Sequence, residues 1–150
     1  MKIKTSELIG ANLDWAVAQV DPMCNGLTFE SVPGGKIGFG IIGGEKTPCA
    51  FLSHGSCLSE RMRLKRDGVI GYSPSTDWSQ GGPLIDSFKL SVYASKEPET
   101  GETHHWVSVD ELADERRGVV GPTPLIAACR ALVFKRHGSC VDIPDDLVAA

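Results

Sequence analysis

One segment near the C-terminal end constrains the fold more than any other, because it combines a helix start, an apolar face and a helix stop. Thr123 can cap a helix whose first turn holds Pro124, and Gly138 stands just past its end. The apolar residues between them recur at helical spacing: Leu125, Ile126, Cys129, Leu132 and Val133. We therefore predict a buried helix that lies on a sheet.

A second helix is predicted near the N-terminus. Side-chain oxygens that can cap a helix are followed by apolar residues at helical spacing, namely Leu8, Leu13, Ala16, Val17 and Val20. The pattern predicts a helix over residues 8–20, which Gly10 could interrupt. Asp21-Pro22 ends it, because the residue before a proline is pushed out of the helical region.

The rest of the chain favours short strands. The string LTFESVPGGKIGFGII at 27–42 alternates around a Pro-Gly-Gly turn and predicts a hairpin of two strands. Further short strands are predicted at 88–93 and 106–109, and 141–144 is typical of an extended tail that packs back. The predicted class is α+β, with two helices packed on a small, mainly antiparallel sheet.

Length and charge narrow the class of protein. A chain of 150 residues fits one domain over 1–150, in which 43–71 is the least legible part. The net charge of −4 argues against binding to duplex DNA, and the lack of a long apolar run argues against a membrane partner. Since the start MKIKTSEL also has no apolar signal core, and the five cysteines form an odd set, we expect a cytoplasmic protein with reduced thiols.

Three motifs can be read as chemical sites, and each has a simpler interpretation. Gly38–Gly43 matches the letters of a dinucleotide fingerprint, but no helix pattern follows, so we expect a glycine-bearing strand and no cofactor. His54-Gly55-Ser56-Cys57 recurs at 137–140 without the spacing of a zinc site, so we expect no metal. The basic run 61–66 could contact phosphates, although an exposed edge strand is the commoner explanation.

A catalytic centre is not predicted. Cys57 follows His54 by three residues, but no third group that would orient such a pair can be named. We therefore assign no catalytic residues and expect a protein that is not an enzyme.

The segment 72–83 concentrates side chains that suit a small planar ligand. Two aromatic rings could stack on a ring, and hydroxyl, carboxylate and amide groups could bond its polar edge. The alternative is a tight structural loop, in which Asp77 or Ser75 caps neighbouring amides and Trp78 fills the core. Both interpretations stay open for the candidate ligand-binding residues Tyr72, Ser73, Ser75, Thr76, Asp77, Trp78 and Gln80.

The string Gly-Pro-Thr-Pro at 121–124 offers a second candidate site. It places the amides of Leu125 and Ile126 at a helix N-terminus, where hydrogen bonds and the helix dipole favour an anion. Capping without a ligand is the alternative, since the Thr123 side chain satisfies one amide by itself. Pro122, Thr123 and Pro124 complete the set of candidate ligand-binding residues.

Four strings of the sequence resemble one known family. Residues 1–8, 13–18, 72–85 and 121–133 look like the NinX family, small proteins of tailed phages encoded among accessory genes. The resemblance implies a phage protein that acts in the host bacterial cytoplasm, and it carries no established activity. Residues 43–71 are longer than the family pattern, which would make them a lineage-specific insertion.

A second likeness concerns Tyr72–Trp78 alone. The order of tyrosine, Pro-Ser, aspartate and tryptophan is similar to a string in phage sponge proteins that sequester cyclic ADP-ribose signals of bacterial defence. The resulting hypothesis is a phage counter-defence protein that holds a small anionic nucleotide-type signal without turnover. Tyr72 or Trp78 would stack on the base, Asp77, Ser75 and Gln80 would bond its edge, and the Thr123 helix end would bind a phosphate.

A different class of function stays open beside it. The chain could be a protein-interaction module that inhibits or adapts a host enzyme, with 43–71 as its contact surface. A host protein and a second copy of the chain, in a homo-oligomer, are therefore further possible partners. A hydrolase or transferase is disfavoured, because no nucleophile, base and orienting group can be named together.

Overall fold

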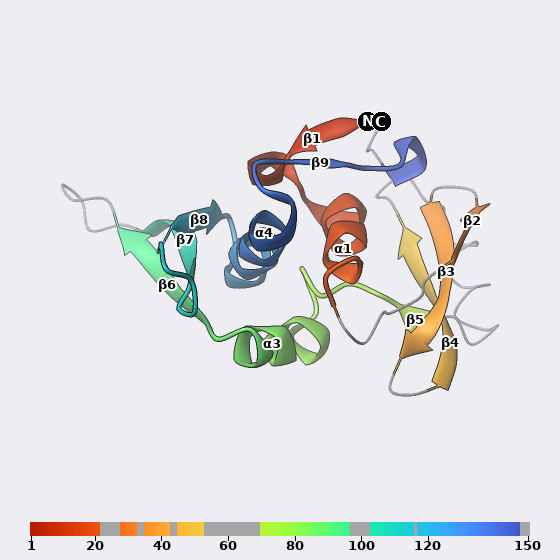
Figure 1. Ribbon diagram of the computed structural model, residues 1–150, viewed down its shortest axis with the longest axis horizontal. Helices are drawn as coiled ribbons and strands as arrows, with labels where there is room; N and C mark the ends of the chain where they lie inside the picture. The colour runs from red at the N-terminus through yellow and green to blue at the C-terminus, as the bar shows by residue number, and fades with distance from the viewer. Residues whose placement is uncertain are drawn as a thin grey trace.

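The computed structural model describes residues 1–21, 28–32, 35–42, 45–52, 70–96, 103–115 and 117–147 (Figure 1). Its helices are α1 (Gly10–Ala18), α3 (Trp78–Ser87) and α4 (Pro124–His137), with short 3-10 helices η1 (Thr5–Glu7) and η3 (Asp145–Leu147). Its strands are β1 (Lys2–Lys4), β2 (Thr28–Val32), β3 (Gly35–Ile42), β4 (Glu45–Leu52), β5 (Ile70–Gly71), β6 (Leu90–Lys96), β7 (Thr103–Asp110), β8 (Gly118–Gly121) and β9 (Cys140–Asp142).

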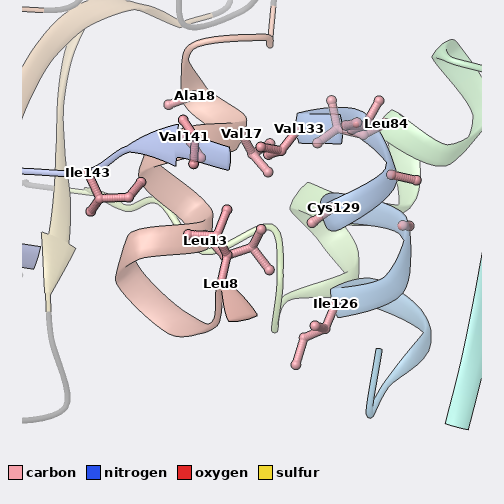
Figure 2. Close-up of a cluster of buried hydrophobic side chains, with 14 of the residues drawn as sticks. Leu8, Leu13, Val17, Ala18, Leu84, Ile126, Cys129, Val133, Val141 and Ile143 are labelled. Carbon is pink, nitrogen blue, oxygen red and sulfur yellow. The ribbon is translucent and has the colours of Figure 1, made fainter. Parts of the chain in front are cut away.

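Helix α4 lies at the centre of the molecule, between α1 on one side and the sheet β6-β7-β8 on the other (Figure 1). Every residue from Leu125 to Val133 is buried, so this helix is covered all round over more than two turns. Figure 2 shows the core between α1 and α4, where Leu13 and Val17 lie near Cys129 and Val133. The prediction of a buried helix lying on a sheet is confirmed.

The three-stranded antiparallel sheet β6-β7-β8 covers α4 with one face. Val92, Ser108 and Val119 are paired across the strands, and therefore lie on the same face of the sheet. Val92 and Val119 pack against the core, while Ser108 between them is fully buried. At the end of β8, Gly121 approaches the backbone of Ala127 so closely that a Cβ atom would lie 2.6 Å from its nitrogen.

The two ends of the described chain are joined by the antiparallel pair β1–β9. The Met1 ammonium group donates to the carbonyl oxygen of Ile143 at 2.7 Å, and the Ile143 N–H donates back to Met1 at 2.8 Å. The hydroxyl of Thr5 donates to the carbonyl oxygen of Gly138 at 2.6 Å, where Gly138 ends α4 with a φ of 78°. The predicted extended tail at 141–144 is thus confirmed as a strand that packs back on the N-terminus.

A second sheet joins β2, β3, β4 and β5. The pair β2–β3 is antiparallel and confirms the predicted hairpin in 27–42, while β4–β5 is a short parallel pair. Gly38 and Gly40 lie within β3, as expected for a glycine-bearing strand. The motif at 54–57 and the basic run at 61–66 lie outside the described residues.

Helix α1 is shorter than the predicted helix over 8–20, and Gly10 begins it instead of interrupting it. Gly10 has a φ of 59°, which glycine adopts at little cost. The N-cap residue is Ile9, which has no side chain that can cap; its own N–H donates to the Asn12 side-chain oxygen at 2.7 Å, and the capping oxygens expected from residues 5–7 do not cap the helix. Those residues form the separate turn η1.

The segment 72–83, which the sequence suggests as a loop with either a binding or a structural role, is not a loop throughout, because α3 begins at Trp78. Gly81, Gly82 and Pro83 all disfavour a helix by local propensity, which is why the pattern looks like a loop. Asp77 caps the helix through the N–H of Ser79 at 2.9 Å, and tertiary packing supports its first turns. Strand β8 was not predicted, and β6 and β7 extend beyond their predicted spans.

Two adjacent glycines in α3, Gly81 and Gly82, provide a matched test of how this helix packs against the Pro74 turn and α4. A Cβ atom at Gly81 would collide with the carbonyl oxygen of Pro74 and lie 2.7 Å from the Leu125 side chain, whereas one at Gly82 would meet only the Trp78 ring at 3.9 Å. We predict that Gly81→Ala lowers the free energy of unfolding by about 1–3 kcal/mol through overpacking. Gly82→Ala should leave it unchanged or raise it by up to about 1 kcal/mol.

Urea unfolding monitored by circular dichroism measures both changes. Equal effects of the two substitutions would contradict the close contact between α3 and the Pro74 turn.

Candidate functional site

A surface hollow of about 220 Å³ lies where the first turns of two helices meet. Trp78 opens α3, and Thr123 and Pro124 begin α4 on the facing wall. The turn before α3 contributes the remaining polar wall. The lining residues are Ser75, Thr76, Trp78, Thr123, Pro124, Leu125 and Ile126. We call this the Trp78–Thr123 hollow.

The indole of Trp78 is 58% exposed, although it lies beside a well-packed core. It therefore does not fill the core, as the structural interpretation of this loop would require. A half-exposed indole at the rim of a hollow presents a flat surface on which another ring can stack. Trp78 is thus placed to contact a planar ligand from one side.

The two helix ends at the hollow differ in their charge. Asp77 caps α3 with a carboxylate, which accepts from the N–H and the hydroxyl of Ser79 at 2.9 and 2.7 Å. These bonds hold the pKa of Asp77 below its usual value. Thr123 caps α4 with a neutral hydroxyl, which accepts from the Ile126 N–H at 3.2 Å. The positive end of α4 is therefore left without a carboxylate in its first turn.

The N–H of Leu125 is the amide that remains for a ligand at this helix end. Pro124 has no N–H, Ile126 donates to the Thr123 side chain, and the Ala127 N–H donates to the Thr123 carbonyl oxygen at 3.0 Å. Among the residues described, Leu125 N–H has no such partner. An anion in the hollow could accept from it and gain from the helix dipole.

Asp14 on α1 lies directly behind the Ser75 wall. The N–H of Ser75 donates to its carboxylate at 2.9 Å, and the two residues are 1% and 4% exposed, with Ser75 the more buried. Burial raises the pKa of Asp14 to about 6, against the opposing effect of the hydrogen bond from the Ser75 N–H. A group that titrates near neutral pH therefore touches the backbone of the hollow.

The structure brings together half of the predicted ligand-binding residues: Ser75, Thr76, Trp78, Thr123 and Pro124 line the same hollow. Tyr72 lies apart from them, only 9% exposed, with its hydroxyl donating to Asp21 at 2.7 Å. Of the two aromatic rings predicted to stack, Trp78 is therefore the accessible one.

The other predicted residues serve the turn or lie beside the hollow. The Gln80 side-chain oxygen accepts from the N–H of Ser73 at 2.7 Å and closes the turn. Asp77 acts as the helix cap described above, and Pro122 is exposed next to the α4 cap. The hydrogen bonds of Asp77 and Gln80 are therefore directed into the turn itself.

Asp14 was missed by sequence reasoning, although a signal exists. It is a carboxylate between Leu13 and the buried Ala16 and Val17 of the same short helix, and so interrupts an otherwise apolar stretch. A carboxylate in a buried helical segment needs a hydrogen-bond donor nearby, but the sequence does not say which residue supplies it.

A second hollow, of about 230 Å³, lies at the C-terminal part of α4. Three of its four charged residues contact other groups of the protein: Lys135 pairs with Asp110 at 3.0 Å, and the Arg117 guanidinium lies 5.3 Å from the centre of the Phe134 ring. It contains none of the residues predicted to bind a ligand. The Trp78–Thr123 hollow is therefore the better candidate.

Neither a metal-binding cluster nor a membrane-spanning helix is found in the part of the chain that the structure describes. No group of three or more histidine, cysteine, aspartate or glutamate side chains there could hold a metal ion. No described helix is both long and apolar enough to cross a membrane.

The architecture is that of a small α+β protein with a surface hollow of about 220 Å³ between two helix N-termini. Residues 4–136 match the family model described as bacteriophage P22, NinX. The chain belongs to this family, which indicates a phage accessory protein. No curated protein matches the chain. Nothing in these comparisons supports the likeness of residues 72–78 to cyclic ADP-ribose sponges.

The buried carboxylate generates a prediction about stability and pH. Because the pKa of Asp14 is about 6 in the folded state and 3.8 as its ordinary value, folding favours the protonated form. Its contribution to stability is complete below about pH 4 and is lost as the pH rises through 6. Relative to Asp14→Asn, the free energy of unfolding of the native protein should fall by about 2–2.5 kcal/mol between pH 4 and 7.

Chemical unfolding at a series of pH values measures this difference. Asp86→Asn is the control, because the Asp86 side chain is exposed and pairs with the exposed Lys89. Parallel curves for the native protein and Asp14→Asn would show that Asp14 titrates normally.

Proposed function

We propose that this phage accessory protein binds a small anionic, nucleotide-type ligand in the Trp78–Thr123 hollow and sequesters it without turnover. The observation that carries the proposal is the meeting of an exposed indole with an uncompensated helix N-terminus in one hollow. A nucleotide combines the two chemical features that such a site can recognise, a planar ring and a phosphate. A counter-defence role in the infected cell's cytoplasm would follow if that ligand is a defence signal.

The ring of the ligand would stack on Trp78. Base–aromatic stacking contributes about 1–3 kcal/mol per base and tolerates different bases. Thr76, an exposed residue that lines the same hollow, would supply a hydroxyl for the polar edge of a stacked ring. These contacts provide affinity without demanding one particular base.

The phosphate would lie at the first turn of α4. There it would accept from the Leu125 N–H and face the positive end of a helix that runs from Pro124 to His137. The neutral Thr123 cap makes this end more favourable for an anion than the α3 end, where Asp77 already supplies a negative charge. The ligand is therefore expected to point its phosphate away from Asp77.

Retention without turnover is supported by the chemistry of the walls. The side chains that line the hollow are hydroxyls, an indole, a proline ring and aliphatic groups. None of these lining side chains is an acid or base that titrates near neutral pH. Binding a nucleotide there would remove it from solution but would not supply a general base to cleave it.

The alternative, a protein-interaction module that acts through residues 43–71, stays a prediction, as does a homo-oligomer. Mass spectrometry of heat-released ligands from protein purified out of defence-activated cells separates the alternatives. An intact nucleotide supports sequestration, an altered nucleotide indicates an enzyme, and a host protein that co-purifies without a nucleotide supports the interaction module.

Stacking on Trp78 is testable with cyclic AMP as a probe that carries one ring and one phosphodiester. We predict that Trp78→Leu weakens cyclic AMP binding at least tenfold in calorimetric titrations, because the stacking surface is lost. Tyr93→Leu is the matched control, since Tyr93 is a 50% exposed aromatic residue on β6, outside the hollow. Unchanged binding by Trp78→Leu, or no binding of cyclic AMP by the native protein, contradicts the proposal.

The phosphate position is testable at the cap of α4. Thr123→Asp keeps a capping oxygen and adds a negative charge, so cyclic AMP affinity should fall at least tenfold, about 1.4 kcal/mol. Thr123→Ser keeps the cap without the charge and should bind like the native protein. Thermal unfolding should show that neither variant is less stable by more than about 1 kcal/mol. If Thr123→Asp binds normally, the phosphate is not at this helix end.

A further inference from the structure

We propose that Asp14 positions the Ser75 wall of the Trp78–Thr123 hollow, and that an anion bound there is held more tightly when the Asp14 carboxyl group carries a proton. The second part rests on the proposed function, whereas the first concerns the free protein.

The positioning role follows from the hydrogen bonds of the turn before α3. Within the turn, the Ser73 carbonyl oxygen accepts from the N–H groups of Thr76 and Asp77 at 3.1 and 2.9 Å. These bonds fix the shape of the turn but do not attach it to the rest of the molecule. The bond from the Ser75 N–H to Asp14 joins it to α1, deep in the core. Ser75 lines the hollow, so Asp14 acts on the site through one backbone amide.

Several charged or titratable groups lie on the elements around Asp14. Cys129 of α4 faces it, and burial, with the charge of Asp14, raises the pKa of that thiol, which keeps it neutral. Arg130 of α4 is directed elsewhere, with its guanidinium donating to the carbonyl oxygens of Leu8 at 2.9 Å and Val120 at 3.1 Å. The carboxylates of Asp77 and Asp21 accept from Ser79 and Tyr72.

Among the described residues, then, Asp14 has no ion pair that would hold its charge in place. An anion in the hollow would add a like charge on the far side of Ser75 and would displace water from the wall. Both effects disfavour the ionised carboxylate. By linkage, ligand binding takes up a proton at Asp14, and affinity rises as the pH falls through its titration.

The residue type at position 14 agrees with this role. An asparagine could accept the Ser75 N–H through its side-chain oxygen without the cost of burying a charge. The aspartate lowers stability at neutral pH, as its raised pKa shows, and gains the ability to titrate near pH 6. A buried group that costs stability and touches the wall of a hollow is better explained by the site than by the core.

The first experiment uses the free protein and tests positioning. In two-dimensional NMR spectra, the Ser75 amide and the Trp78 indole N–H signals should shift together with a midpoint near pH 6. Both shifts should disappear in Asp14→Asn and persist in the exposed control Asp86→Asn. Movement of the Ser75 signal alone would show that Asp14 does not act on the hollow, and absence of any titration would overturn the proposal.

The second experiment measures cyclic AMP affinity at pH 5 and pH 7.5. The phosphodiester and adenine of this probe do not change charge over that range, so its own titration does not interfere. The native protein should bind at least threefold more tightly at pH 5, and Asp14→Asn should bind equally at both. The same pH dependence in both proteins, or none in the native protein, overturns the linkage.

Failure of the proposed function is distinguishable from failure of this proposal. If the native protein does not bind cyclic AMP at either pH, the proposed function and the linkage both fail, and the NMR titration still decides whether Asp14 positions the turn. Asp14→Ala provides a further measurement, because it removes the acceptor. It should lose binding at both pH values, and Asp14→Asn should restore it at both.

Discussion

The enclosure of α4 is the constraint on which the rest of this structure depends. Nine consecutive residues of the helix are buried, so any polar group among them must find its partners inside the protein. Arg130 is such a residue. Its buried guanidinium has no ion pair among the described residues and donates to two backbone carbonyl oxygens instead. Those oxygens belong to Leu8 and Val120, so one side chain of the central helix joins the N-terminal segment to the sheet.

The enclosure of α4 also determines where a ligand could contact the backbone of this helix. A helix covered along its length presents unsatisfied backbone groups only at its ends. The C-terminal end is used by Gly138 and Thr5, which bond each other where β1 and β9 begin to pair. The N-terminal end opens on the Trp78–Thr123 hollow, where Thr123 satisfies one amide and leaves Leu125 N–H. The candidate site therefore lies at the N-terminal end of α4, where the Leu125 N–H has no partner among the described residues.

The parts of the fold and of the candidate site that could be predicted are those whose sequence pattern lies within one short stretch of the chain. The cap, the apolar spacing and the terminal glycine of α4 are contained in one short stretch, and each was found in the structure. Helix α3 was missed because Gly81, Gly82 and Pro83 oppose helix formation, and its support comes from Pro74 and Leu125. Ser75 and Trp78 were singled out separately from Thr123, but only the packing of α3 on α4 places them in one hollow. Nothing in the sequence distinguishes the buried Tyr72 from the exposed Trp78 six residues later.

Two residues beside the turn that precedes α3 depart from ordinary protein chemistry: Trp78 begins α3, and Asp14 on α1 accepts from the Ser75 N–H. Trp78 leaves a large apolar surface in water, and Asp14 holds a carboxyl group out of water with a raised pKa. Burying the indole would raise the stability of the protein, and so would replacing the buried acid with its amide. Residues that lower stability in this way are expected to cluster at functional sites, where binding requires side chains that packing alone would not favour. Ser75 links the two residues, because it lines the hollow with Trp78 and donates its N–H to Asp14.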